Sequence, residues 1–225
     1  MRTLERTVEA LKGSLNDVEQ KYAPRLLWCQ GDDTILRQFA SVSIVGSRKV
    51  SSEGKNRAKR LAKILAERNI AILSGLAEGV DTIAHQTAIE CQVKTVGVIG
   101  TPLDRFYPKQ NEALQRKISE EHLLVSQFPI GTPTRPACFP QRNRTMALLS
   151  DATIIVEASD DSGSLHQGWE ALRLGRPLFI LKSSVDDRSL KWPKELMNYG
   201  AMVLSNDNID DLFDSLPAGG VTIEI

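Results

Sequence analysis

Three short segments combine glycine with serine close behind apolar runs, which is typical of phosphate-binding turns. They are Gly46-Ser47-Arg48, Ser74-Gly75 and Ser162-Gly163-Ser164. Glycine lets the backbone approach a ligand closely or turn through positive φ. A helix that starts beyond such a turn offers free N–H groups and the positive end of its dipole. A single turn could serve only the fold. Three of them predict a site that contacts phosphate repeatedly, as a nucleotide or a nucleic-acid backbone requires.

A basic stretch without acids could supply the complementary charge. Between His122 and Ser150 the sequence contains no Asp or Glu. The arginines of this stretch are Arg135, Arg142 and Arg144. With Arg48 they could form a positive patch, although the formal net charge is zero. Phe139 lies among them, and an aromatic ring beside cations is what base stacking uses. The alternatives stay open: Arg48 as a surface side chain covering apolar area, and Phe139 as an anchor of its loop.

Patterns for catalysis and for metal binding are missing. Asp81 and His85 are one helical turn apart, and we interpret them as a local structural pair. His166 and Glu170 have the same spacing and indicate either a ligand contact or a solvated helix face. Gly46 is not followed by the glycines of a dinucleotide-binding G-x-G-x-x-G motif. We therefore expect a protein that is not an enzyme, with no cofactor and no metal.

The cysteines and the N-terminal residues indicate the cellular compartment of the protein. The three cysteines are widely spaced, which indicates neither disulfides nor a zinc site, and we expect buried thiols: Cys29, Cys91 and Cys138. The first residues are charged where a signal peptide would be apolar. No apolar run approaches the roughly 20 residues that span a bilayer. We therefore expect a cytoplasmic protein with no membrane contact.

The elements that must position these residues alternate between strands and helices. Apolar runs predict strands at 26–29, 42–45, 70–73, 95–99, 123–126, 153–156, 178–181 and 202–204. An amphipathic helix is predicted over 4–18, and another helix with Asp81 as its N-cap. A proline-marked loop is expected from 128 to 140, followed by a helix over 142–149. Strands apolar on both faces indicate an α/β fold with a mostly parallel sheet and helices on both faces.

The domain organisation follows from the same pattern. We expect residues 1–24 to form an N-terminal helical extension, residues 25–217 the core, and residues 218–225 a C-terminal tail. The loops behind the carboxyl ends of parallel strands form the ligand crevice of such a sheet. The glycine turns follow predicted strands, so we expect them to meet at that edge.

Five motifs in order resemble the DNA-processing protein A (DprA, or Smf) family, over about residues 26–181. They are Ile44-Val45-Gly46-Ser47-Arg48, Ser74-Gly75-Leu76-Ala77-Glu78-Gly79-Val80-Asp81, Leu103-Asp104 with Tyr107-Pro108, Phe139-Pro140-Gln141-Arg142-Asn143-Arg144, and Ser162-Gly163-Ser164. The resemblance implies an extended Rossmann-like fold and a dimeric, single-stranded DNA-binding accessory protein of natural transformation and recombination. It also implies a RecA-type recombinase as a possible partner.

The resemblance also implies the residues that contact DNA and phosphate. These are Arg48, the stretch with Arg135, Phe139, Arg142, Asn143 and Arg144, and the turns at Gly46, Ser47, Ser74, Gly75, Ser162, Gly163 and Ser164. The helix around His166 and Glu170 differs from that of typical members and resembles the wider superfamily of LOG-type phosphoribohydrolases. The alternative function is therefore a nucleotide-binding sensor or a nucleotide hydrolase. The sequence lacks the fuller Gly-Gly-x-Gly-Thr-x-x-Glu motif of that group.

Overall fold

A nine-stranded sheet organises the residues that the computed structural model describes, 2–217. The predicted tail at 218–225 lies outside the described residues. The strands are β1 (Leu4–Arg6), β2 (Leu27–Gly31), β3 (Ser41–Val45), β4 (Ala71–Ser74), β5 (Thr95–Ile99), β6 (Leu123–Ser126), β7 (Ala152–Ile155), β8 (Leu178–Leu181) and β9 (Met202–Leu204). Their order in the sheet is β1-β2-β6-β5-β4-β3-β7-β8-β9. Eight of these strands match the predicted positions to within two residues.

The sheet is parallel from β6 to β9 and antiparallel at its other edge. Strand β2 pairs antiparallel with both β1 and β6. Every residue of β3, β4, β5, β6 and β7 is buried, because helices cover both faces of the central strands. The predicted α/β fold with a mostly parallel, Rossmann-like sheet is confirmed.

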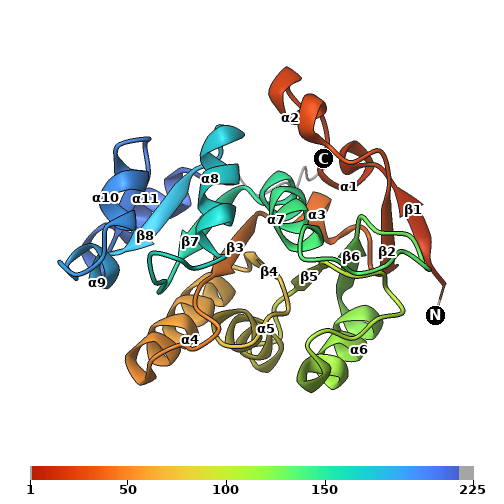
Figure 1. Cartoon of the computed structure of the whole chain (residues 1–225), viewed down its shortest axis with the longest axis horizontal. Helices are drawn as coiled ribbons and strands as arrows, with labels where there is room; N and C mark the ends of the chain where they lie inside the picture. The colour runs from red at the N-terminus through yellow and green to blue at the C-terminus, as the bar shows by residue number, and fades with distance from the viewer. Residues whose placement is uncertain (1, 218–225) are drawn as a thin grey trace, which may run out of the picture.

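Helices pack in two layers (Figure 1). Those on one face share a core with α7 and include α1 (Val8–Lys12), α3 (Ile35–Gln38), α7 (Cys138–Leu149), α8 (Leu165–Arg173) and α10 (Trp192–Met197). Those on the other face are α4 (Ser52–Glu67), α5 (Val80–Glu90), α6 (Glu112–Glu121) and α11 (Ile209–Asp214). The remaining helices are α2 (Asp17–Tyr22), α9 (Lys182–Val185), η1 (Lys109–Asn111) and η2 (Asn206–Asn208).

The single helix predicted over 4–18 is wrong. The stretch forms strand β1 and helix α1, and α2 begins only at Asp17. Gly13 ends α1 with φ of 97°, a conformation that favours glycine, and Asn16 starts α2 with a capping box. The apolar spacing was compatible with one helix, but Leu4 instead pairs with Cys29 across the sheet edge. Residues before 25 thus share the sheet and the core with the rest of the chain.

A buried cluster of charges fastens this N-terminal segment to the sheet. Lys12 Nζ donates to Asp151 Oδ2 at 2.7 Å and to Ser41 Oγ at 2.8 Å, and both ionic side chains are less than a tenth exposed. Arg176 bridges to Asp151 at 3.8 Å and pairs with Glu19 of α2. Burial lowers the pKa of Lys12, and the neighbouring Asp151 opposes that shift. The cluster holds α1 and α2 against the starts of β3 and β7.

Three further details differ from the sequence predictions. Helix α7 starts at Cys138, so Phe139 and Pro140 lie in its first turn instead of in the preceding loop. The N-cap of α5 is Gly79, and Asp81 lies inside the first turn. The Asp81 carboxylate accepts hydrogen bonds from the N–H groups of Gly75 and Ala77, at 3.1 and 3.3 Å. Of the cysteines, Cys29 and Cys138 are buried as predicted, whereas Cys91 is exposed.

His85 is fully buried and hydrogen bonds to Thr95, not to Asp81 as predicted. The distance from Nδ1 to Thr95 Oγ1 is 2.7 Å, and that hydroxyl donates to the carbonyl of Ile72 at 2.7 Å. Because the hydroxyl proton is already used, the ring must donate from Nδ1. Burial lowers the pKa of His85 to about 3.

This histidine should make the protein sensitive to acid. The unfolded chain binds a proton at His85 below its ordinary pKa, whereas the folded chain does not until about pH 3. Stability contributed by the neutral ring is therefore lost as the pH falls through that window. Between pH 7 and pH 4 we expect a loss of about 3 kcal/mol in the free energy of unfolding that the His85→Asn variant does not show. Urea denaturation of both proteins at each pH measures this loss. An equal loss in the wild-type protein and the variant would contradict the prediction.

Candidate nucleic-acid interface

A candidate cavity lies at the point in the sheet where the chain stops adding strands on one side and begins to add them on the other. From β3 the chain proceeds through β4, β5 and β6 on one side, whereas β7, β8 and β9 follow on the other. The carboxyl ends of β3 and β7 therefore flank a switch point, where open α/β sheets bind ligands. A cavity of about 520 Å³ lies there. We call it the main cavity, and its lining residues include Val45, Gly46, Ser47, Arg48, Lys49, Ala77, Asp81, Phe139, Arg142, Asn143 and the loop 161–164.

Backbone contacts lock the loops of this edge together. The N–H of Ser47 donates to the carbonyl of Glu157 behind β7 at 2.7 Å, and the Ser47 carbonyl accepts from the N–H of Val80 at 3.2 Å. A Cβ atom on Gly46 would overlap Val80 and the Glu157 carbonyl, and one on Gly79 would overlap the backbone of Ser47. Gly79 also has φ of 77°. Close approach of three loops thus requires glycine at these two positions.

The opposite wall is formed by α7 and the serine turn. Asn143 Nδ2 donates to the carbonyl of Gly163 at 3.2 Å, and its Oδ1 accepts from Arg142 Nε at 3.0 Å. The hydroxyls of Ser162 and Ser164 lie 2.7 Å apart. Hydroxyl and backbone donors are thereby gathered on one side of the cavity, where an anionic ligand would accept from them.

Arg142 forms part of the floor and is only 6% exposed. Its Nη1 donates to the carbonyls of Gly75 and Val98, at 2.5 and 2.9 Å. A side chain at Gly75 would overlap this guanidinium group. Burial lowers the pKa of Arg142 and raises that of Asp81, while the attraction between the two opposes both shifts. Most donors of Arg142 are therefore committed to the protein.

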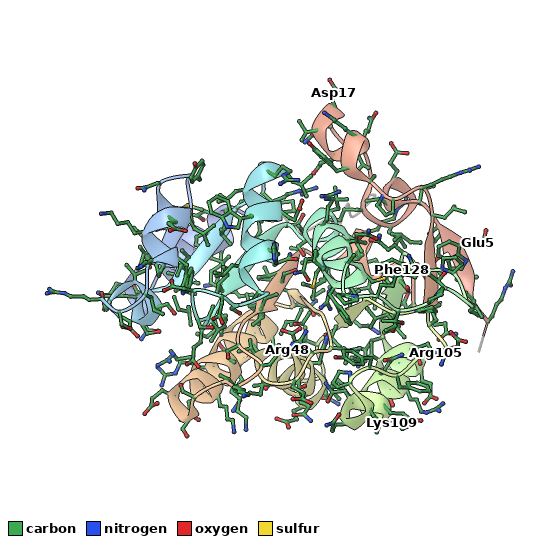
Figure 2. All side chains as sticks on the ribbon, in the orientation of Figure 1. Glu5, Asp17, Arg48, Arg105, Lys109 and Phe128 are labelled. Atoms are coloured by element: carbon green, nitrogen blue, oxygen red, sulfur yellow. The ribbon has the colours of Figure 1, made fainter. Side chains whose placement is uncertain are left out.

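Arg48 is an exposed cation that lines the main cavity, and Figure 2 labels its position. Within residues 2–217 its side chain makes no ion pair and no hydrogen bond to another residue. Lys49 adjoins it and also lines the cavity. The acid at this rim is Asp161, whose pKa is lowered by the Ser159 hydroxyl that donates to it. The free guanidinium of Arg48 can form paired hydrogen bonds with a phosphate.

Phe139 lines both the main cavity and a smaller one. The second cavity, of about 80 Å³, is lined by Arg48, Gly75, Ala77, Glu78, Gly100, Tyr107, Pro108, Phe139 and Arg142. A Cβ atom on Gly100 would overlap the Phe139 ring, so this glycine leaves room for it. The ring is partly exposed, and its centroid is 5.3 Å from that of Tyr107. It could stack on a nucleobase entering from either side.

The structure brings most of the predicted site residues to one place. The main cavity includes Gly46, Ser47, Arg48, Phe139, Arg142, Asn143, Ser162, Gly163 and Ser164, and the second cavity includes Gly75. Ser74 is buried beneath them, with its hydroxyl donating to the Ile44 carbonyl at 2.7 Å. Neither cavity includes Arg135 or Arg144. Arg135 is exposed ahead of α7, and Arg144 pairs with Glu170 at 3.0 Å and packs over the ring of Tyr22.

The lining residues that were absent from the predicted site include Lys49, Tyr107 and Asp161. Lys49 could have been found from its position beside Arg48 behind a strand. Tyr107 belongs to one of the motifs that resemble the family, but no local pattern showed that it meets Phe139. His166 lines the main cavity, whereas Glu170 does not, because it faces Arg144 and Arg173. Of that pair, only the histidine lines the cavity, and its contact with a ligand stays a prediction.

Two properties of the described chain bear on the class of site. Residues 2–217 contain no group of three His, Cys, Asp or Glu side chains arranged to hold a metal ion. In the same part of the chain, every helix is too short or too polar to cross a bilayer.

Comparison with known sequences identifies close relatives. A family model described as DNA recombination-mediator protein A matches residues 12–217. The DNA processing protein DprA of Bacillus subtilis is 33% identical over 198 residues, which cover 88% of this chain and 66% of the relative. That of Streptococcus pneumoniae is 38% identical over 193 residues, or 84% and 67% of the two chains. The Smf protein of Escherichia coli is 32% identical and is matched over 52% of its length. The chain thus spans about half to two thirds of these relatives.

Solved structures show the same similarity. The DNA processing protein A of S. pneumoniae superposes with a TM-score of 0.81 at 32% identity, covering 97% of this chain and 76% of that one. That of Helicobacter pylori, reported for its single-stranded DNA binding mode, has a TM-score of 0.78 at 29% identity and covers 95% and 97%. A molybdenum cofactor binding protein of Rippkaea orientalis, at 18% identity and TM-score 0.57, shares the fold alone.

The sheet order, the glycine turns at its switch point and the match over residues 12–217 agree with the resemblance found in the sequence. The chain belongs to the DNA recombination-mediator protein A family, whose members include the DNA processing proteins DprA and Smf.

Proposed function

We propose that this protein binds single-stranded DNA in the main cavity and acts as a non-catalytic accessory protein in DNA processing. The observation that carries the proposal is Arg48, an exposed guanidinium with no ion pair in residues 2–217, which lines a cavity together with the two turns Gly46-Ser47 and Ser162-Gly163-Ser164. Phosphate contacts to such groups are independent of base sequence. We therefore expect binding with little sequence preference.

The aromatic wall favours single strands over duplex. Phe139 offers a partly exposed ring face beside Arg48, and a base can stack on it only when that base has left its own partner. In a duplex the same base would have to be flipped out, at a cost of a few kcal/mol. The H. pylori relative reported for single-stranded DNA binding supports the same reading.

A wider role is proposed on the basis of the family. We propose that DNA binding serves DNA uptake in natural transformation and recombination, with the protein acting as a homodimer in the cytoplasm and a RecA-type recombinase as its partner. The curated relatives named as DNA processing proteins support this proposal. The chain spans about half to two thirds of those relatives, so the recombinase partnership is a proposal separate from DNA binding.

A free nucleotide is the competing ligand for the same cavity. His166 lines it, which would suit contact with a sugar. The acid that a hydrolase would need nearby, Glu170, is instead held by Arg144 and Arg173. We therefore favour DNA, and free nucleoside monophosphates serve as competitors in the binding experiment.

Replacing Arg48 with alanine should weaken DNA binding. A charge-assisted contact to phosphate is worth about 1.5–3 kcal/mol, so we expect the Kd for oligo-dT to rise at least about tenfold. The slope of log K against log salt should decrease by about 0.7, the contribution of one phosphate contact on a single strand. Fluorescence anisotropy of a labelled oligo-dT at several salt concentrations measures both quantities.

Two other arginines provide the controls. Arg68, which pairs with Asp210 at 3.6 Å and packs on Phe213, lies outside both cavities, so Arg68→Ala should leave the Kd unchanged. Arg144→Ala should weaken binding less than Arg48→Ala, because Glu170 already neutralises it. Failure of the wild-type protein to bind oligo-dT at low salt would refute the proposal, and competition by one mononucleotide but not by DNA would favour the nucleotide reading.

Arg142 should behave differently from Arg48. Arg142→Met leaves the carbonyls of Gly75 and Val98 without their donor and Asp81 without its nearby cation. We expect the free energy of unfolding to fall by about 3 kcal/mol, since each buried unsatisfied group costs about 1–3 kcal/mol. Arg48→Ala, at an exposed position, should change it by less than about 0.5 kcal/mol. Urea denaturation compares the two, and equal effects would contradict the assignment of Arg142 to the floor of the site.

A further inference from the structure

Tyr107 presents an exposed aromatic ring to the second cavity. It is 49% exposed, whereas the other aromatic side chains near this edge are engaged elsewhere. Phe106 is covered by the guanidinium of Arg116, whose carbon lies 4.3 Å from the ring centroid. The remaining tyrosines also have partners, since Tyr22 packs under Arg144 and Tyr199 against Trp169. What distinguishes Tyr107 is its place, because its exposed ring lines a cavity beside Arg48 and Phe139.

The loop that carries Tyr107 is anchored to the binding edge. The carbonyl of Pro108 accepts from the N–H of Asn111 at 3.0 Å. Asn111 Nδ2 in turn donates to the carbonyl of Leu76 at 2.9 Å and to Thr82 Oγ1 at 2.8 Å. These contacts fix the loop to the turn between β4 and α5, so that the ring is held in place before a ligand arrives. Such preorganisation lowers the entropic cost of binding.

The geometry of the two rings suits two splayed bases. The centroids of Tyr107 and Phe139 are 5.3 Å apart and their planes are tilted by 44°. Bases stacked in a helix are parallel and about 3.4 Å apart along the axis. Two consecutive bases that stack on these two rings must therefore unstack from each other and turn apart. Only an unpaired strand can do this at low cost.

Positive charge lies between the two positions. Arg48 lines both the main and the second cavity, so one guanidinium can reach a phosphate that links the two nucleotides. Glu78, an exposed acid, also lines the second cavity and repels phosphate. An uncharged base on the Tyr107 ring is therefore favoured in that cavity over the DNA backbone.

We propose that Tyr107 is a second base-stacking residue, which with Phe139 holds two consecutive nucleobases on either side of a phosphate bound by Arg48. This rests on the proposed function, single-stranded DNA binding at the switch point. It adds the second cavity to the site and assigns that cavity to a base and not to the backbone.

The test compares a normal oligonucleotide with one that lacks bases. Labelled oligo-dT and an abasic deoxyribose-phosphate oligomer of equal length are titrated with the wild-type protein and with Tyr107→Ala, Tyr107→Leu and Tyr107→Phe. We expect the Kd for oligo-dT to rise about tenfold for the Ala and Leu variants and to stay unchanged for the Phe variant. The Kd for the abasic oligomer should not change in any of them. Tyr199→Ala, which removes an exposed tyrosine outside both cavities, is the matched control and should bind like the wild type.

The outcomes separate the two proposals. If the Ala and Leu variants lose affinity for both oligomers equally, Tyr107 only supports the loop and the stacking assignment is wrong. Unchanged affinity for oligo-dT in either variant also overturns it. Failure of the wild-type protein to bind either oligomer overturns the proposed function and the stacking role with it. The Leu variant keeps apolar bulk at the position, so it decides the question if the Ala variant does not fold.

Discussion

The buried guanidinium of Arg142 joins the parts of the molecule that meet beneath the two cavities. It connects α7 to the carbonyls of Gly75 and Val98 at the ends of two neighbouring strands, and it orients Asn143. Burying a charge costs several kcal/mol, and here carbonyl acceptors and the nearby Asp81 offset that cost. The consequence is a rigid floor: Gly75 has no room for a side chain, and the loops around it are set before any ligand binds.

Charge is distributed so that a chain without net charge still has a cationic site. Lys12, Arg176 and Arg144 are neutralised by Asp151, Glu19 and Glu170, away from the cavities. Arg48 and Lys49 remain at the mouth, opposed mainly by Asp161. Local potential and not total charge governs attraction of a polyanion. The zero net charge of the sequence therefore does not argue against nucleic-acid binding.

Arg142 and Arg144, which flank Asn143 on α7, have different roles for a geometric reason. Residues i and i+2 on a helix point in directions about 200° apart, so Arg142 and Arg144 cannot serve the same surface. Arg142 enters the floor of the site, and Arg144 reaches Glu170 and Tyr22 on the other side of α7. From the sequence alone both arginines were predicted to join Phe139 at the site, because the partners that distinguish the two sides of α7, such as Glu170 and Tyr22, are distant in the chain.

The sequence by itself determined the alternation of strands and helices, the burial of the central strands and the positions of the glycine turns. These are local properties, set by apolar runs of strand length and by residues that allow tight turns. Tertiary structure alone decided that β7 lies beside β3, that the loops of Gly46 and Gly163 therefore face one cavity, and that Tyr107 meets Phe139. It also decided that Leu4 joins the sheet edge, where pairing with β2 overrides a helical spacing. Contacts between residues distant in the chain depend on the order of strands, which no local pattern encodes.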